Sequence, residues 1–512
     1  MKYLLGLDEG TTGCKAVVFD LSGNVIGEDY REYPCYFPNP GWVEQKDDEI
    51  TEGLYASVRS AIEKSKVDPK DIVSMAISTQ GGVWGPLDKD GKLLRPFMGW
   101  QDGRGIKYAE KIRNNEIIDK DLYYQISGYS IGTVLAGTKI LWFKDEEPEI
   151  AAKTAMYSTN QDFFTRAFGA KEYWTDTASA QRLGVFDVDN RVWSKEIFKA
   201  FGLEEAKFPK IGRGGQVVGK VSKAVSDITK LAEGTLICMG AHDQNCSTIG
   251  AGLVNDGDAV LVMGTYGSIF VGSDKAVRDP NKILMVKSNV GPETFTMEAA
   301  SSTAASSYRW YRDTFASLEK SLAPSMNLDP YELINAQIAL VPPGANGVTF
   351  LPYLAGADGG ARGDSYARGA FLGLNLSTSK REIARAVMEG ITFEMKDNFE
   401  AQKKAGVNIK EVRLTGGATK SKLWNQMQAD IYGVPVKLLQ TSETGCLGAA
   451  IYAGIGAGLF KTYNEAVEKV VHVKETYTPN PANFAAYDKA FGLFQKAYDA
   501  LNKGGYFKKT HE

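Results

Sequence analysis

The chain has few of the residues on which much metal and nucleophile chemistry depends. Its 512 residues include only three histidines, His242, His472 and His511, too few for a multi-histidine metal site or for much choice in a Ser-His-Asp triad. Five cysteines, an odd number without a C-x-x-C pair, argue against a disulfide framework and a zinc site. We therefore expect chemistry that depends on carboxylates, backbone amides and a bound cation.

Long apolar runs and an excess of one charge are also missing. No stretch approaches the roughly 18 apolar residues of a membrane helix, and Asp8 and Glu9 stand where a signal peptide would continue its apolar core. The formal net charge is -3, with 59 basic and 62 acidic residues, which provides no basic face for nucleic acid or a membrane. We expect a cytoplasmic protein that acts on a small molecule.

What the chain does have is length and a repeated pattern. At 512 residues it exceeds the size at which one hydrophobic core stops growing, so two domains of roughly 250 residues are expected. An apolar run, a turn rich in glycine and threonine, and a second apolar run predict a hairpin over residues 3–19. The same order returns over residues 258–271 and indicates a weak internal repeat.

Helix and strand patterns alternate around the two hairpins. The predicted elements are helices over residues 47–64, 380–404 and 422–431 and strands at residues 72–77 and 412–414. Such alternation, with hairpin openings, predicts an α/β fold with mixed sheets flanked by helices. We place the boundary near residue 252, which gives domains 1–252 and 253–512 with a ligand cleft between them.

The first turn has the residues expected of a phosphate-binding loop. It reads Asp8-Glu9-Gly10-Thr11-Thr12-Gly13-Cys14-Lys15. Glycines let backbone amides approach a polyphosphate, threonine hydroxyls donate hydrogen bonds, and Lys15 can neutralise phosphate charge. Asp8 could hold Mg²⁺ through water, because this ion prefers oxygen ligands and dehydrates reluctantly. An ordinary hairpin turn is the alternative, and the second turn at Gly264 and Thr265 weighs against it.

This turn resembles the opening phosphate motif of the FGGY carbohydrate kinases, within the actin and hexokinase superfamily, which reads Asp-x-Gly-Thr-Thr-x-x-Lys. Further segments are similar to the family in the same order: PGWVEQ at 40–45, WQDGR at 100–104, GTKILW at 137–142, GAHDQ at 240–244, MGTYG at 263–267 and GGATKSKLW at 416–424. The resemblance covers nearly the whole chain. It implies two ribonuclease H-like domains and transfer of phosphate from Mg-ATP to a hydroxyl of a small sugar or polyol.

The resemblance also implies roles for single residues. Asp243 matches the catalytic aspartate, which accepts the proton of the attacking hydroxyl and, with Asp8, is expected near the metal ion. The nucleotide contacts that it implies are Thr11, Thr12, Lys15, Gly264, Thr265, Gly267, Gly416, Gly417 and Ser421. Without the family, an aspartate such as Asp243 would more often be a turn or cap residue. One departure concerns the nucleotide side, because Arg309 stands where glutamine is expected.

On the acceptor side the chain departs from two branches of the family. Gln80 is followed by Gly81 and Gly82, where glycerol kinases carry Arg-Glu and xylulokinases usually carry Met-His. Val134 replaces the tyrosine of glycerol kinases, so glycerol is a poor candidate. A ketopentose such as xylulose is the first choice, and a polyol such as xylitol or erythritol, or another sugar, stays open. The expected acceptor contacts are Gln80, Gly81, Gly82, Trp100, Asp102, Asp243 and Gln244.

Two other classes of function stay open. An actin-like protein that binds partners under nucleotide control would share the phosphate turns, but such proteins lack the Trp-x-Asp-x-Arg and Gly-Thr-Lys-x-x-Trp segments. A non-catalytic sugar sensor would have no need to keep Asp8, Thr11, Thr265 and Asp243 together. A homodimer would be in keeping with the family.

A further string, at residues 214–221, nearly spells a P-loop. Val221 stands where a P-loop has the Ser or Thr hydroxyl that binds magnesium, and the flanking residues favour a strand. We therefore expect no nucleotide role for this segment.

Overall fold

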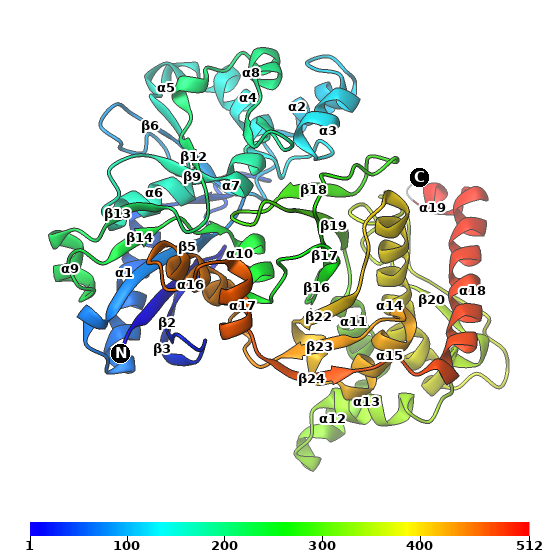
Figure 1. The fold of residues 1–512 in the computed structure, drawn as a ribbon. Helices are drawn as coiled ribbons and strands as arrows, with labels where there is room; N and C mark the ends of the chain where they lie inside the picture. The colour runs from blue at the N-terminus through cyan, green and yellow to red at the C-terminus, as the bar shows by residue number, and fades with distance from the viewer. Residues whose placement is uncertain (511–512) are drawn as a thin grey trace.

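The computed structural model describes residues 1–510 and consists of two α/β halves, each built on a seven-stranded mixed sheet (Figure 1). The first sheet has the order β13-β14-β5-β1-β2-β3, and β15 also pairs with β5. Its strands are β1 (Tyr3–Glu9), β2 (Gly13–Asp20), β3 (Val25–Glu32), β5 (Ile72–Thr79), β13 (Val217–Lys220), β14 (Leu236–Cys238) and β15 (Ala241–His242). In its centre, β1 runs antiparallel to β2 and parallel to β5.

The second sheet repeats this centre. Its order is β18-β19-β17-β16-β22-β23-β24, and β16 runs antiparallel to β17 and parallel to β22. The strands are β16 (Asp258–Met263), β17 (Gly267–Ser273), β18 (Met285–Ser288), β19 (Phe295–Ser301), β22 (Glu411–Thr415), β23 (Val436–Leu439) and β24 (Val473–Tyr477). The two predicted hairpins are therefore equivalent parts of two mixed sheets, and the predicted fold class is confirmed.

The predicted helices lie within one or two residues of their expected ends. They are α1 (Asp47–Ser65), α14 (Lys380–Ala405) and α15 (Lys422–Tyr432). In α1 the apolar residues four apart, such as Leu54 and Val58, are buried in the core of the first half. α14 begins at a capping box, in which Ser379 and Glu382 satisfy each other's backbone amides, and ends at Gly406 with φ 114°.

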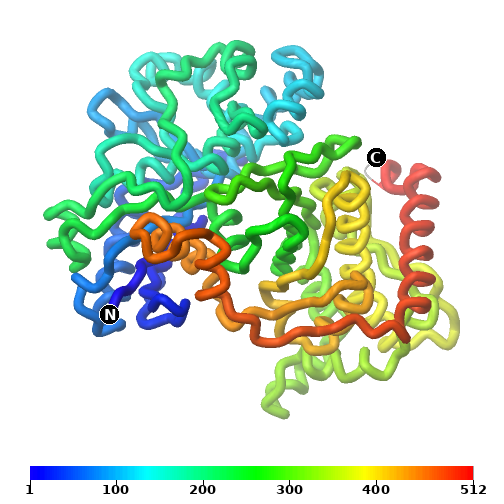
Figure 2. Tube along the Cα trace, viewed as in Figure 1, coloured from blue at the N-terminus to red at the C-terminus, as the bar shows by residue number. Residues whose placement is uncertain are grey.

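One segment of the second half of the chain packs in the first half of the fold. Helix α16 (Thr444–Gly456), drawn in orange in Figures 1 and 2, lies against β1, β5 and α10 (Asp243–Gly250). The helices α10 and α16 approach very closely, because a Cβ at Gly448 would lie 1.9 Å from the Cys246 carbonyl oxygen. A Cβ at Gly250 would lie 2.0 Å from the Thr444 carbonyl oxygen. The two halves are thus joined by a glycine-lined helix pair as well as by the chain near residue 252.

The remaining elements build the outer layers. A four-stranded sheet beside the first half has the order β4-β7-β6-β8. Its strands are β4 (Glu44–Gln45), β6 (Trp84–Leu87), β7 (Phe97–Met98) and β8 (Met156–Thr159). The helices near it are α4 (Ala136–Glu146), α6 (Asn160–Phe168) and α7 (Thr177–Arg182), and those that matter in the second half are α11 (Ala305–Phe315) and α13 (Pro330–Ile338). Within residues 1–510 the helices are all too short or too polar to cross a membrane.

The string that resembles a P-loop is not a loop that leads into a helix. Residues Val217–Lys220 form β13, and Val221 is buried at its end. The short helix α9 (Lys223–Thr229) begins only after Ser222, which caps it. The predicted strand character of this segment is confirmed.

Candidate active site

The first phosphate turn follows β1, and its charged residues Asp8 and Lys15 already have partners outside the turn. Asp8 accepts a hydrogen bond at 2.6 Å from the Ser78 hydroxyl on β5. Burial, and next to it the charge of Glu443, raises the pKa of Asp8 above its ordinary value. The Lys15 ammonium lies 2.8 Å from Glu28 and 2.7 Å from Glu443. The positive charge of Lys15, on the strand after the turn, is therefore shared between two carboxylates.

Behind the turn lies a buried carboxylate, Glu9. It accepts hydrogen bonds from Gln80 Nε2 at 2.6 Å and from Asn160 Nδ2 at 2.7 Å. Burial raises the pKa of Glu9 well above its ordinary value. Gln80 Nε2 also donates to Gln45 Oε1 at 2.9 Å, whereas Gln80 Oε1 is buried without a partner within residues 1–510. The Gln80 amide nitrogen is thus engaged within the protein, and its oxygen is buried.

Two predicted acceptor residues lie close together along the chain but in different surroundings. Trp100 faces the first turn, since its Nε1 donates to Thr11 Oγ1 at 3.0 Å. Asp102 is buried in an ion pair with Arg104 at 2.7 Å and accepts a second bond from the Val43 amide at 2.7 Å. The structure thus brings Trp100 to the turn, whereas the oxygens of Asp102 are already occupied.

The loop after β5 that contains Gly81 and Gly82, called the acceptor loop from here on, is held by a buried lysine. Lys139 Nζ donates to the carbonyl oxygens of Gly82 at 3.2 Å, Gly99 at 2.9 Å and Trp100 at 3.4 Å. Burial lowers the pKa of Lys139 to about 7. The lysine of the Gly-Thr-Lys motif therefore joins two segments around the predicted acceptor site rather than contacting a carboxylate.

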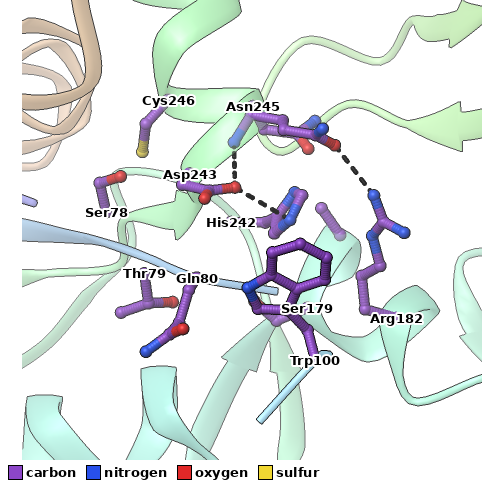
Figure 3. Close-up of polar contacts among 12 residues, drawn as sticks. Ser78, Thr79, Gln80, Trp100, Ser179, Arg182, His242, Asp243, Asn245 and Cys246 are labelled. Carbon is purple, nitrogen blue, oxygen red and sulfur yellow. Dashed lines mark hydrogen bonds and ion pairs between the residues drawn. The ribbon is translucent and has the colours of Figure 1, made fainter. Parts of the chain in front are cut away.

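Asp243 begins helix α10 beside this loop (Figure 3). Its Oδ1 accepts from the Gln244 amide at 2.6 Å and lies 3.0 Å from His242 Nε2. Burial raises the pKa of Asp243 to about 7, and the charge of Asp8 contributes in the same direction. Solvent that reaches the exposed 39% of the side chain limits this shift. A carboxylate with such a pKa is suited to accept a proton near neutral pH.

Next to Asp243, the Gln244 side chain connects both halves of the fold. Its Oε1 accepts from Arg182 Nη2 at 2.9 Å and from Lys287 Nζ at 2.5 Å. Lys287 on β18 also forms a buried ion pair with Glu298 on β19. The cations Arg182 and Lys287 act after burial to hold the pKa of His242 well below its ordinary value. His242 is therefore neutral. Strands β18 and β19 of the second sheet thus form part of the surroundings of Asp243 in the first half.

The second phosphate turn opens into a cavity of about 670 Å³ in the second half. Its lining includes four predicted nucleotide residues, namely Gly264, Thr265, Gly417 and Ser421. Arg309 on α11 donates to Thr265 Oγ1 at 3.4 Å, and a Cβ at Gly417 would meet no atom within 4 Å. The stacked rings of Tyr308 and Tyr331, 5.0 Å apart, stand beside the space. The cavity can accept a flat ring at its glycine loop and phosphates at its turn.

The other predicted nucleotide residues are placed differently. Gly267 packs against the start of α11, since a Cβ there would lie 2.9 Å from Ala304 Cβ. Gly416 has a positive φ of 92° at the start of its loop. Thr12 is exposed on the first turn. A cavity of about 860 Å³ between Arg191, Trp193 and Phe208 contains none of the predicted residues.

Asp8 and Asp243 are the groups that could hold Mg²⁺. The charge of Asp8 raises the pKa of Asp243, so the two carboxylates lie close enough to repel each other. A cation between them would relieve this repulsion, and Mg²⁺ is commonly bound by one or two carboxylates with water and phosphate oxygens. Residues 1–510 contain no cluster of three or more His, Cys, Asp or Glu side chains able to hold a metal. The donor set therefore fits an ion that arrives with its phosphates.

Comparison with known proteins gives the same picture over the whole chain. Family models described as the FGGY family of carbohydrate kinases match residues 3–250 with their N-terminal domain and residues 259–457 with their C-terminal domain. A xylulose kinase from Staphylococcus epidermidis is 28% identical over 97% of this chain and 96% of its own. A glycerol kinase from Solidesulfovibrio magneticus is 29% identical over 97% of each chain. The structure of a ligand-bound xylulose kinase from Lactobacillus acidophilus superposes with a TM-score of 0.89, 25% identity and coverage of 98% and 99%.

Three side chains at the site were not predicted from the sequence. They are the imidazole of His242, the buried Glu9 and the guanidinium of Arg182. His242 and Glu9 each stand next to a predicted aspartate, and this adjacency was the available signal. Arg182 offered none, because it reaches Gln244 only through the tertiary fold.

Proposed function

The chain belongs to the FGGY family of carbohydrate kinases, and from this premise we propose that it phosphorylates a hydroxyl of a ketopentose such as xylulose, with Asp243 as general base. As a member of this family it is a phosphotransferase with an alcohol group as acceptor, and ATP is the phosphoryl donor. The observation that carries the proposal is the state of Asp243, which lies beside the first phosphate turn with a pKa raised to about 7.

The proposed reaction places different tasks in the two halves. The cavity at Thr265 and Gly417 holds the nucleotide, and the first turn at Thr11 and Thr12 faces its phosphates. In a loose phosphoryl-transfer transition state the acceptor keeps its proton until late, so Asp243 need not be a strong base. General-base help of this kind contributes about 100- to 10,000-fold. Asp8 and Asp243 would hold Mg²⁺, which when bound offsets the charge of the phosphates.

The acceptor is the finer part of the proposal. Relatives at similar identity carry the names xylulose kinase and glycerol kinase, so overall similarity does not separate the two acceptors. Gly81, Gly82 and Val134 argue against glycerol, because none of them can supply a polar side chain to its hydroxyls. A ketopentose therefore stays first, with a polyol such as xylitol or erythritol, or another sugar, as the alternative.

The test is an ADP-release assay across pentuloses, hexuloses and polyols, with Asp243→Asn beside the wild type. We expect one ketopentose to give the highest kcat/KM, and Asp243→Asn to lose about 100- to 10,000-fold in kcat while it still binds ATP. Asp90→Asn, on an exposed turn, is the matched control. Undiminished sugar-dependent turnover in Asp243→Asn would overturn the mechanism, and a polyol as best substrate would move the acceptor to the alternative.

A further inference from the structure

Gly81, in the acceptor loop, borders directly on the ring of His242. A Cβ added to Gly81 would lie 2.0 Å from Cδ2 and 2.1 Å from Nε2 of this imidazole. Carbon atoms essentially never approach side chains so closely, and here the obstacle is a buried ring. The His242 imidazole therefore occupies the volume that any side chain at position 81 would need.

The next position cannot supply a side chain either. Gly82 has φ 76°, and a Cβ there would lie 2.5 Å from the Val134 carbonyl oxygen. Lys139 fixes the same residue from the other side through the Gly82 carbonyl oxygen. The loop after β5 thus presents backbone alone beside Asp243, and the side chain in this place comes from position 242.

His242 also determines which oxygen of Asp243 is free. The ring nitrogen Nε2 lies 3.0 Å from Oδ1, which as a carboxylate oxygen can only accept a hydrogen bond. The Gln244 amide donates to the same oxygen at 2.6 Å. Within residues 1–510 no hydrogen bond is made to Oδ2 (Figure 3). Both contacts are made at Oδ1, which leaves Oδ2 as the oxygen available to an acceptor hydroxyl.

The surroundings hold this arrangement in place. The His242 side chain is only 4% exposed, so its ring cannot swing away without moving its neighbours. The Gln244 side chain is fixed through Oε1 by Arg182 and Lys287, which steadies the backbone amide that meets Oδ1.

We propose that His242 is the positioning residue of the general base, and that Gly81 is its required partner, so that positions 81 and 242 act as one unit. This inference rests on the proposed kinase function. The acceptor oxygen bonds to the γ-phosphorus as the bond from that phosphorus to the leaving oxygen of ADP breaks, and the acceptor proton goes to Asp243 Oδ2. Without the ring beside Oδ1, only the Gln244 amide would hold the carboxylate, and a carboxylate held at one point can rotate so that Oδ2 leaves this alignment.

The first test separates the hydrogen bond from the shape of the ring. His242→Gln keeps an N–H donor at a similar reach, whereas His242→Leu fills similar space without one. We expect His242→Leu to lose at least about tenfold in kcat with an unchanged KM for ATP, and His242→Gln to recover most of that loss. A purely structural role would affect both variants alike. Equal kcat in His242→Leu and the wild type, or equal losses in Leu and Gln, would overturn the positioning role.

The second test is a double-mutant cycle on the shared volume. Gly81→Ala should lower both the thermal unfolding midpoint and kcat, because its Cβ displaces the ring. In a His242→Gly background the same Gly81→Ala change should have little further effect, since there is no ring to displace. Additive losses in the double variant would contradict the shared volume.

The two arms also separate this inference from the proposed function. The unfolding cycle needs no substrate, so it measures the coupling between positions 81 and 242 even if the wild type phosphorylates none of the sugars tested. That result would count against the proposed acceptor alone. A wild type active on xylulose, together with a fully active His242→Leu variant, would remove this inference and leave the kinase function intact.

Discussion

In both halves of the molecule a pair of glycines follows the equivalent strand, but the space beside the two pairs is used differently. Gly81 and Gly82 follow β5, which lies parallel to β1, and Gly416 and Gly417 follow β22, which lies parallel to β16. A Cβ at Gly417 would meet no atom within 4 Å, whereas one at Gly81 would meet the His242 ring at 2.0 Å. One loop keeps an open space for a flat ligand, and the other gives its space to a side chain that orients Asp243.

The strands before the two phosphate turns also differ, in the polarity of their last residues. β1 ends in Asp8 and Glu9, and β16 ends in Val262 and Met263. The first turn is therefore backed by carboxylates whose pKa values are raised by burial, and the second by apolar side chains. The same pattern of strand, turn and strand thus ends in carboxylates in one half and in apolar residues in the other.

The contrast between the two loops is tested most directly by adding a side chain at the open one. Gly417→His has space to fold, but its ring would occupy the cavity that we assign to adenosine. Contacts between a base and its platform are worth about 1–3 kcal/mol, so we expect the KM for ATP to rise about 10- to 100-fold. Steady-state kinetics with varied ATP measure this. Gly492→His, at an open glycine on α18 (Phe484–Lys503), is the control, and an unchanged KM in Gly417→His would remove adenosine from this cavity.

A second experiment examines where the two loops are alike. Gly82 and Gly416 have φ values of 76° and 92°, and in each a Cβ would lie 2.5 Å from a backbone carbonyl oxygen. Alanine at either position combines a left-handed backbone, costing about 1–2 kcal/mol, with a clash that only backbone movement relieves. We expect both variants to lower the thermal unfolding midpoint by about 4–8 °C. Gly417→Ala should leave it unchanged, and equal stability of all three variants would contradict the predicted strain.

The third prediction concerns the buried charge that only the first loop has. Lys139 has a pKa lowered to about 7 in the fold, whereas an exposed lysine titrates near 10.5. Between these values the unfolded chain binds more protons, so stability should rise with pH, by at most about 1.4 kcal/mol per unit. The unfolding midpoint of the wild type should rise from pH 7 to 9 relative to that of Lys139→Met. Parallel pH profiles would show that Lys139 does not change its protonation on folding.

Much of the fold could be predicted because its signals are local. The apolar spacing of α1 and the glycine that ends α14 act within a few residues of where they stand, and the repeated hairpin is visible in the same way. The return of α16 to the first sheet was not predictable, because its partners lie in a distant part of the chain. Nothing in the sequence near residues 444–456 marks the sheet on which the helix packs.

The candidate site also contains residues that could be predicted from the sequence and contacts that could not. The residues of both turns could be named from their pattern of glycine and threonine, whereas Asp243 could be named only from the resemblance to the family. The sequence also suggested Asp102 as a sugar contact, and the structure pairs its oxygens with Arg104 and the Val43 amide. The contact of His242 with Gly81 could not be predicted, since it depends on how closely β15 approaches the end of β5.

The smallest expected effect compares the cations at the two turns. Lys15 is paired with Glu28 and Glu443, whereas Arg309 has no carboxylate at ion-pair distance within residues 1–510 and points to Thr265. Arg309 is exposed, and charge contacts of this kind are worth about 0.2–1 kcal/mol. Arg309→Gln should therefore raise the KM for ATP by about two- to fivefold, with less effect at high salt. Arg309→Lys, which keeps the charge, should stay nearer the wild type. If Gln and Lys behave alike at low salt, Arg309 is not the cation for the phosphates.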